Sequence, residues 1–386
     1  MQHILSVSKM AILHSAKIFL IYLINAIIYK NTLILSYNNN IFFENMNIKL
    51  LLIITLIGNC ACFSATLLNT PLYRYWNCIG FKHCFVDNKP YQFNVGEIPL
   101  IAWKTENNTY LSTLNFCKHF GSTLNEGKIE DGCLECPYHG YKHSENDKCG
   151  VIVEHDNKLW WSYNPVEKVP QTIPYIGEDF VSDYIEYEMN ENLPFCMYNS
   201  MDINHAQHIH SGIFGFGSDI PVKNYKHIKK AENIIGTSFD HYLKGNIKLM
   251  NKNVSLGTEA FASNYHEYIY PSTTWSVVSH DEYKKLVIGF SMTPVDTYKT
   301  KWYVTIRSNY MKEGINKNIL NLAARMILSQ DKKQFERQSK NTLLRDSFIH
   351  TNMLNNEDHI QDMKKIFKNY EYPKLKDFID YHISNS

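Results

Sequence analysis

Four side chains in one short stretch constrain this chain more than any other feature. Cys117 and His119 form a Cys-x-His pair, and after sixteen residues Cys136 and His139 form a Cys-x-x-His pair. Two thiolates and two imidazoles on paired loops can hold Zn²⁺, or a [2Fe–2S] cluster with both thiolates on one iron and both imidazoles on the other. The Cys-x-His pair favours the two-iron cluster, because zinc-binding pairs usually enclose two to four residues.

The chain on both sides of this motif has the pattern of a small β domain. Short apolar stretches alternate with turns rich in Gly, Asn and Asp, which is typical of short strands. Three prolines lie in residues 164–175 and indicate a domain boundary. We therefore predict an all-β domain over residues 69–168. Its clearest strands are 91–95, 99–103 and 158–163.

Residues 169–386 show two other patterns. Apolar and polar residues alternate over four long stretches, which predicts antiparallel strands with one buried face. Two further stretches carry apolar residues at helical spacing. The predicted fold class is therefore α+β, with the small all-β domain followed by a larger domain built on an antiparallel sheet. The predicted strands are 238–248, 273–280, 285–292 and 301–310, and the predicted helices are 196–211 and 315–345.

A second set of candidate ligands lies in the first of these helices. Asp202, His205 and His210 form an Asp-x-x-His-x-x-x-x-His pattern. The two histidines are five positions apart, so a regular α-helix would point them about 140° away from each other. Both can face one metal ion only where the helix ends or distorts between them, for example at a π-bulge. His208, three positions after His205, is the alternative ligand.

A third ligand is expected to be a carboxylate, because two histidines and one carboxylate hold non-haem Fe(II) and leave positions open for O₂ and substrate. Asp331 is the best candidate, since it lies on the apolar face of the predicted helix 315–345. A carboxylate on a buried face is costly unless it is paired or bound to a metal. A salt-bridged surface residue is the simpler interpretation of Asp331. The alternatives nearer the polar tail are Asp346 and Asp358.

Residues 68–168 resemble the Rieske family, most clearly at Cys136-Pro-Tyr-His139-Gly140. Tyr141 stands where ring-hydroxylating members commonly have Trp. The Rieske proteins of respiratory and photosynthetic complexes carry a disulfide-forming Cys in each loop. This chain has Ser122 and Tyr138 at those places, which favours the oxygenase or ferredoxin type.

The longer span 68–345 resembles the oxygenase (alpha) component of the Rieske non-haem iron oxygenases. Its motif from Asn199 to His210 looks like the monooxygenase and O-demethylase branch, such as vanillate and dicamba demethylases. The N-terminal segment looks more like that of pheophorbide a oxygenase. The resemblance implies a helix-grip catalytic domain over residues 169–386. Asn199 lies either at the edge of the pocket or on the helix surface.

The resemblance also implies two cofactors and a path between them. A Rieske-type [2Fe–2S] cluster is bound by Cys117, His119, Cys136 and His139, and a mononuclear Fe(II) is bound by His205, His210 and Asp331. Asp202, as a buried carboxylate, orients an iron-ligand imidazole and links the iron site to His139 of the partner subunit in a head-to-tail homotrimer. The iron then activates O₂ to hydroxylate, demethylate or ring-open a small apolar organic substrate.

Two observations concern the partners of the chain. No Gly-rich dinucleotide fingerprint follows a predicted strand, so an external ferredoxin or reductase is expected to supply electrons. Lys and Arg number 39 against 38 Asp and Glu, which argues against nucleic-acid binding through a broad basic surface. The alternative function is a Rieske electron-transfer protein that lacks a working mononuclear iron site.

Residues 1–68 differ from the rest and predict a targeting or membrane-anchor segment. Two apolar runs, 18–29 and 50–63, are each shorter than the ~20 residues that span a bilayer. The second run follows a short basic segment and ends in small residues, which is the layout of a secretory signal; two core helices are the alternative. Translation from Met46 would leave residues 1–45 out of the working protein. The expected location is a membrane or an organelle, and the resemblance to plastid-associated members points to the plastid.

Overall fold

The computed structural model describes a large part of the chain. The described residues are 71–166, 169–175, 177, 181–210, 221–243, 246–249, 252–255, 260–279, 281–309, 315–339, 357–367 and 370. The chain divides into two compact units, Met1–Phe63 and Ser64–Ser386, and all described residues belong to the second. The targeting or anchor prediction for residues 1–68 and the alternative ligand Asp346 lie outside the described residues.

None of the helices in the described ranges is long and apolar enough to cross a membrane. Membrane association and an organelle location depend on residues 1–68 and stay predictions. The predicted domain boundaries at residues 68 and 168 also stay predictions.

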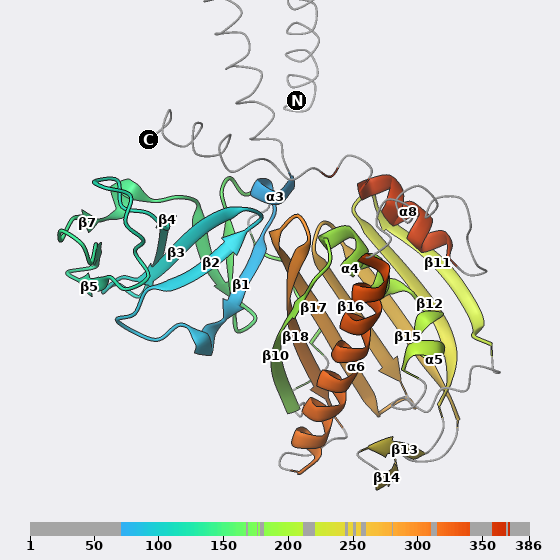
Figure 1. Cartoon of the computed structure of the whole chain (residues 1–386). Coiled ribbons are helices and arrows are strands. Elements are labelled where there is room, and N and C mark those ends of the chain that lie inside the picture. The colour runs from blue at the N-terminus through green and yellow to red at the C-terminus, as the bar shows by residue number, and fades with distance from the viewer. Residues whose placement is uncertain are drawn as a thin grey trace, which may run out of the picture. The chain divides into compact units, whose positions relative to one another are not determined.

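The N-terminal part of the described chain consists of short antiparallel strands, as predicted (Figure 1). A short helix, α3 (Pro71–Arg74), precedes three sheets of three strands each, and two 3-10 turns, Lys82–Cys84 and Glu145–Asp147, lie between strands. The first sheet holds β1 (Asn77–Phe81), β9 (Lys158–Ser162) and β8 (Val151–His155). The second holds β2 (Tyr91–Val95), β3 (Ile98–Lys104) and β4 (Tyr110–Leu114). The third holds β5 (Lys128–Glu130), β6 (Cys133–Glu135) and β7 (Lys142–His143).

Strand β3 is buried on both faces, and the two faces pack into different cores. Leu100 packs into a core that includes Trp161 of β9. Ile101 points the other way, because successive side chains of a strand alternate, and it packs in a second core with Cys117 and Cys136. The two loops that carry these cysteines are therefore attached to the hydrophobic interior of the domain.

The C-terminal part is built on one seven-stranded antiparallel sheet in the order β10-β18-β17-β16-β15-β12-β11 (Figure 1). Its strands are β10 (Val181–Met189), β11 (Lys223–Ala231), β12 (Ile234–Leu243), β15 (Ala260–Ile269), β16 (Thr273–Ser279), β17 (Lys285–Asp296) and β18 (Lys299–Ser308). A separate hairpin pairs β13 (Asn246–Leu249) with β14 (Lys252–Ser255). The predicted antiparallel sheet and the α+β class are confirmed. The predicted strand 238–248 is wrong in its limits, because it joins parts of β12 and β13.

Four helices of the described residues lie on one face of the large sheet (Figure 1). Buried side chains of three of them form the main core together with alternate strand residues, among them Ile235, Tyr268 and Trp302. The predicted helix at 315–345 is confirmed by α6 over the described residues. The helices are α4 (Leu193–Met201), α5 (His205–Ile209), α6 (Ile315–Ser339) and α8 (Asp358–Phe367).

The predicted helix 196–211 is in fact two helices with a turn between them. The side chain of Asn192 caps the start of α4. At the other end, the Asp202 carboxylate accepts hydrogen bonds from the backbone N–H groups of Asn204 at 2.8 Å and His205 at 3.3 Å. Such local bonds compete with the continuation of a helix, so the chain turns and α5 begins at His205.

The two parts of the second unit are joined by hydrogen bonds to β1, an edge strand of its own sheet. The hydroxyl of Thr293 on β17 donates to the carbonyl of Cys78 at 2.6 Å. The hydroxyl of Tyr303 on β18 donates to the carbonyl of Ile79 at 2.9 Å. Side chains of the large sheet thus satisfy buried backbone carbonyls of the N-terminal domain.

Candidate metal centres

Three predicted ligands meet in the C-terminal domain, and we refer to His205, His210 and Asp331 as the triad. His205 begins α5, His210 follows its last residue, and Asp331 lies on α6. Nε2 of His210 lies 3.2 Å from Oδ1 of Asp331, and Nε2 of His205 lies 3.7 Å from the same oxygen. One ligand atom from each residue lies within 4.8 Å of the other two. The triad is therefore compact enough to hold a single metal ion.

The short length of α5 resolves the conflict in the spacing of the two histidines. The helix has five residues, and His210 is its C-cap with φ −107° and ψ 15°, so the backbone has left the helix at that point. The rings of His205 and His210 consequently lie 5.1 Å apart between centroids. The alternative ligands His208 and Asp358 are exposed and do not join the group.

The imidazole of His205 is oriented by the main chain. Its Nδ1 donates a hydrogen bond to the carbonyl oxygen of Asp202 at 2.7 Å, which leaves Nε2 unprotonated in the neutral ring. The carboxylate of Asp202 lies 3.8 Å from Nδ1, and the side chain is 31% exposed. Within the single chain the carboxylate is partly exposed, and its expected role as an orienting group that links two subunits stays a prediction. The carboxylate caps the turn before α5, and the carbonyl holds the Nδ1 proton.

The imidazole of His210 is oriented by a side chain that was not predicted. Its Nδ1 donates a hydrogen bond to Oε1 of Gln330 at 2.8 Å. Burial lowers the pKa of His210, but the hydrogen bond and charge of Asp331 outweigh burial, so the pKa is raised overall. A metal ion between His210 and Asp331 would replace the shared proton. The position of Gln330, directly before the predicted ligand, is the only sequence signal for this role.

Asp331 is 4% exposed, so it is not the salt-bridged surface residue of the simpler interpretation. Its Oδ1 also accepts a hydrogen bond from Nδ2 of Asn199 at 3.4 Å. Asn199 lies on α4 and therefore stands at the site, one of the two placements considered for it. Phe335, one turn further along α6, is buried in the main core and therefore fixes which face of α6 points toward the large sheet.

The donor set of the triad fits a divalent first-row metal ion. Two imidazole nitrogens and a carboxylate oxygen are the ligands of non-haem Fe(II) sites, and similar sets also occur around Zn²⁺. Among the described residues, Asp331 forms ion pairs with the two histidines and with no Lys or Arg. A metal cation would compensate this buried negative charge.

The four Rieske candidates lie on two loops of the same construction. In each loop a glycine four positions after the cysteine donates its N–H to the cysteine carbonyl. The Gly121 N–H donates to Cys117 at 2.7 Å, and the Gly140 N–H donates to Cys136 at 3.0 Å. Both glycines have positive φ, 73° and 72°, a conformation that glycine adopts at no steric cost.

The sulfur and nitrogen ligands of these loops lie in different environments. Cys117 and Cys136 are 2% and 3% exposed, and none of the described cysteines forms a disulfide. His119 and His139 are exposed, and their ring centroids lie 4.9 Å apart. This arrangement fits a two-iron cluster with both thiolates on an inner iron and both imidazoles on an outer one.

Models of two protein families match the two parts of the chain. The Rieske [2Fe-2S] domain matches residues 75–170, and the vanillate O-demethylase oxygenase C-terminal domain matches residues 192–356. The chain thus carries a Rieske domain followed by a C-terminal domain of the vanillate O-demethylase oxygenase type. Both ligand loops and the whole triad lie inside the matched residues.

Related proteins match this chain over part of their length. The oxygenase component of 3-ketosteroid-9-alpha-monooxygenase from Rhodococcus rhodochrous is 24% identical over 162 residues, 36% of this chain and 41% of the relative. Dicamba O-demethylase from Stenotrophomonas maltophilia is 26% identical over 150 residues, 32% and 44% of the two chains. Chlorophyllide a oxygenase, chloroplastic, from Oryza sativa subsp. japonica is 22% identical over 171 residues, 40% and 31%. The chain thus spans less than half the length of these relatives.

Solved structures of dicamba monooxygenase have the same fold as this chain. The structure bound to 3,6-dichlorosalicylic acid has a TM-score of 0.64 and 16% identity, and covers 78% of this chain and 98% of its own. The structure bound to dicamba has a TM-score of 0.62 and 15% identity, with the same coverage. At this identity the likeness shows the fold alone. It confirms the prediction of a small Rieske domain followed by a domain with a large antiparallel sheet.

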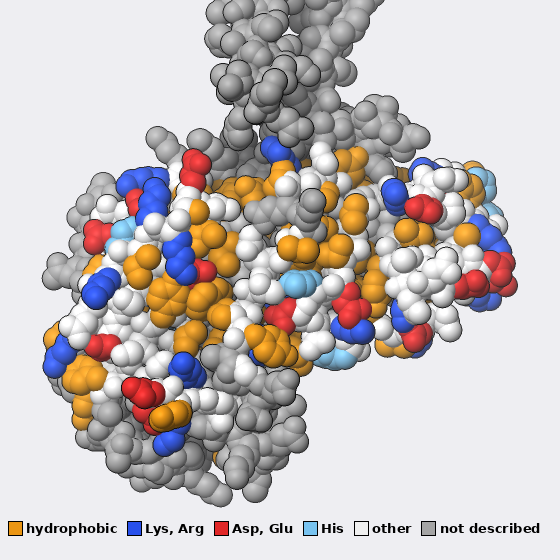
Figure 2. Space-filling model, turned by 180° about the vertical axis from the view of Figure 1, so that it is seen from behind, with side chains coloured by type: hydrophobic (Ala, Val, Ile, Leu, Met, Phe, Trp, Pro, Cys, Tyr) orange, Lys and Arg blue, Asp and Glu red, His pale blue; other side chains and the backbone are white. Residues whose placement is uncertain are grey.

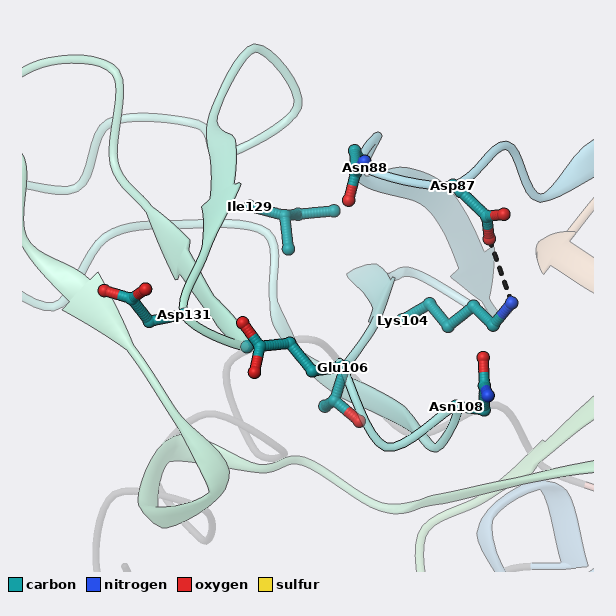
Figure 3. A pocket seen from close by; sticks show the side chains of 9 residues that line it. Asp87, Asn88, Lys104, Glu106, Asn108, Ile129 and Asp131 are labelled. Atoms are coloured by element: carbon teal, nitrogen blue, oxygen red, sulfur yellow. Dashed lines mark hydrogen bonds and ion pairs between the residues drawn. The ribbon is translucent and has the colours of Figure 1, made fainter.

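A separate hollow on the N-terminal domain contains none of the predicted ligands (Figure 3). Its volume is about 270 Å³, and its lining is mostly polar or charged. Lys104 and Asp87 form an ion pair of 2.9 Å in its wall, and Ile129 is an apolar side chain that faces it. This lining differs from the mostly apolar pocket that an apolar substrate requires.

Charged and apolar side chains are mixed on the face that Figure 2 shows. Lys and Arg lie beside Asp and Glu, and hydrophobic side chains fill patches between them. This mixture agrees with the net charge of +1. The absence of a nucleic-acid partner stays a prediction.

Proposed function

We propose that this chain is the oxygenase component of a Rieske system. It would take electrons from a separate ferredoxin or reductase and use O₂ to hydroxylate, demethylate or ring-open a small apolar organic compound. In a hydroxylation, two electrons and two protons are consumed with one O₂, one oxygen atom enters a C–H bond, and the other leaves as water. A Rieske-type [2Fe–2S] cluster and a mononuclear Fe(II) would supply the redox chemistry, and the protein supplies ligands, orientation and a dry site.

The observation that carries this proposal is the compact triad, which lies in the same unit as the two Rieske loops. A simple electron carrier needs the N-terminal domain alone. The burial of Asp331 between two imidazoles costs free energy that a bound cation would compensate. The triad therefore supports an iron site that consumes electrons and weighs against the electron-transfer alternative.

The residues around the triad would hold protons and atoms in place. The carbonyl of Asp202 keeps a proton on Nδ1 of His205, and Gln330 keeps a proton on Nδ1 of His210. Both Nε2 atoms are then available as ligands in the neutral tautomer. Asn199 donates to Oδ1 of Asp331 and restrains the rotation of that carboxylate.

Electron entry is proposed to occur between copies of the chain. The exposed imidazoles of the Rieske loops are flanked by Phe120 and Tyr138, which are 72% and 63% exposed. Asp202 contributes two groups here: its carboxylate is half exposed, and its carbonyl oxygen holds the ring of His205. His139 of the partner subunit could therefore meet Asp202 at a surface that both groups reach. The homotrimer implied by the resemblance is proposed on this basis.

The substrate is proposed to lie between the triad and the large sheet. Gln207 on α5 contacts His241 on β12, with 3.3 Å between their Nε2 atoms. The ring of Phe239 lies 5.1 Å from that of His241, and burial lowers the pKa of His241 to about 4, so its imidazole is neutral. These side chains suit an apolar molecule with a polar group. The relatives' names refer to 3-ketosteroids, dicamba and chlorophyllide a, which supports an organic substrate without choosing among them.

Metal content and product analysis test the proposed function. The oxygenase should hold three iron atoms per chain, two in the cluster and one at the triad, whereas the electron-transfer protein should hold two. The reduced full-length protein, mixed with O₂ and a metabolite extract, should convert a compound into one that gains an oxygen atom or loses a methyl group. Two irons per chain, zinc at the triad, or an extract left unchanged by the fully iron-loaded protein would contradict the proposal.

A further inference from the structure

His143 lies in the interior of the N-terminal domain without an evident protein partner. It is the second residue of β7 and is 0% exposed. Both ring nitrogens are buried, and neither has a hydrogen-bond partner among the described residues. A buried imidazole that makes no hydrogen bond is costly, so a group outside the polypeptide is expected to bind it.

The position of His143 in the sheet points to the Rieske cluster as that group. In the ladder between β6 and β7, His143 pairs with Leu134. Leu134 packs in the same core as Cys117 and Cys136. Paired residues on neighbouring strands project from the same face of a sheet, so the imidazole lies on the face that carries the two thiols.

Aromatic contacts connect His143 to the outer ligands as well. The ring of Tyr141 lies 4.9 Å from that of His143, and it stacks on the ring of His119 at 6.5 Å and 17°. His143 is therefore one aromatic ring away from an imidazole ligand and faces the core that holds both thiol ligands.

The charged groups near His143 are already engaged with each other. Oδ1 of Asp147 pairs with Lys118 at 3.0 Å, and Oδ2 accepts a hydrogen bond from the Ser144 N–H at 3.0 Å. Burial lowers the pKa of His143, so the ring is neutral near pH 7 and has one N–H to donate. The remaining acceptors at this depth would be the sulfur atoms of the cluster.

We propose that the buried N–H of His143 donates a hydrogen bond to a sulfur atom of the Rieske cluster, either a bridging sulfide or a cysteine thiolate, and raises the reduction potential of the cluster. Hydrogen bonds to the sulfurs are among the factors that set cluster potentials. The reduced cluster carries the larger negative charge, so the hydrogen bond stabilises it more than the oxidised form. His143 is thus a positioning residue that sets how readily the chain accepts an electron. This inference rests on the cluster part of the proposed function.

The wild-type protein labelled with ¹⁵N-histidine provides a test without substitution. Pulsed EPR of the reduced cluster should show two strongly coupled nitrogens, from His119 and His139, and a third, weakly coupled nitrogen from His143. Exchange into D₂O should add a weakly coupled deuteron at the same site. Two nitrogens alone would overturn the inference.

Substitutions test the effect on the potential. In His143→Phe the ratio of reduced to oxidised cluster at a fixed mediator potential should fall about tenfold, which corresponds to about 59 mV for one electron. His143→Gln keeps a side-chain N–H and should retain most of the wild-type potential. The matched control Tyr73→Phe removes a buried hydroxyl from the other core of the domain and should leave the potential unchanged.

The outcomes separate this inference from the proposed function. An intact Rieske EPR signal with an unchanged potential in His143→Phe overturns the inference alone. A wild-type protein with no Rieske signal overturns the proposed function as well. If both variants fail to assemble a cluster, the ¹⁵N spectrum of the wild type decides, since three coupled nitrogens support the hydrogen bond and two contradict it.

Discussion

The two candidate metal centres of this chain are built in different ways. The Rieske ligands lie within 22 positions of each other, on two loops that have the same cysteine-to-glycine turn. The triad joins α5 to α6, and His205 and Asp331 are 126 positions apart. The first centre depends on local backbone geometry, and the second depends on how helices pack on a sheet. Changes near the triad should therefore act on the mononuclear iron and leave the cluster in place.

His205→Ala is the strongest test of that separation. Loss of one of the three ligands should remove the mononuclear iron and abolish turnover, because the metal supplies the oxidative chemistry. The Rieske EPR signal should stay intact. His208→Ala, an exposed residue of the same short helix, is the matched control and should keep both iron and turnover. A variant that lost the EPR signal but kept turnover would reverse the roles assigned to the two centres.

Gln330→Leu should have the next largest effect. The variant keeps all three ligands but removes the acceptor that orients His210, and loss of such a partner lowers metal affinity by about 10–100-fold. Titration against a competing chelator measures the affinity, and the cluster absorbance should not change. Ser329→Ala alters the exposed neighbour on α6 and serves as the control. Equal iron affinity in Gln330→Leu and wild type would show that Gln330 does not orient the ligand.

Asp202→Asn should leave both metals bound, because the group that holds His205 is the main-chain carbonyl. We expect slower electron transfer from the cluster to the mononuclear iron, since the substitution removes the charge of the half-exposed carboxylate. Rapid mixing of the reduced protein with O₂ follows cluster oxidation directly. A wild-type rate would remove the Asp202 carboxylate from the electron route.

Gly121→Ala and Gly140→Ala should each destabilise the N-terminal domain by a small and similar amount. A left-handed conformation costs a residue with a side chain about 1–2 kcal/mol. A new Cβ at Gly121 meets no atom within 4 Å, and at Gly140 it meets the flexible Glu135 carboxylate at 3.3 Å, so neither variant adds a severe clash. Chemical denaturation of the full chain measures the free energy of unfolding. Clearly unequal losses of unfolding free energy in the two variants would show that the two cysteine-to-glycine turns are not equivalent.

The placement of the ligand residues could be predicted from the sequence for different reasons at the two centres. The spacing of Cys117, His119, Cys136 and His139 is local and needs no knowledge of packing. The prediction for Asp331 rested on one long-range argument, that a carboxylate on an apolar helix face needs a partner. Its burial and its approach to His210 agree with that argument, and metal binding itself stays a prediction.

The parts that could not be predicted depend on geometry that residue types do not encode. The break between α4 and α5 arises because Asp202 bonds to two backbone N–H groups, and apolar spacing alone gives one continuous helix. The role of Gln330 depends on how α6 approaches the chain after α5. The use of a carbonyl rather than a carboxylate to hold His205 likewise depends on the turn and is invisible in the side-chain pattern.

Asp202 connects α4 to the triad. It is the C-cap of α4, its carboxylate accepts a hydrogen bond from the N–H of His205 at the start of α5, and its carbonyl accepts one from the His205 ring. The same carboxylate is partly exposed to solvent. A substitution or contact that displaces this carboxylate would therefore also disturb the turn that places His205 in the triad.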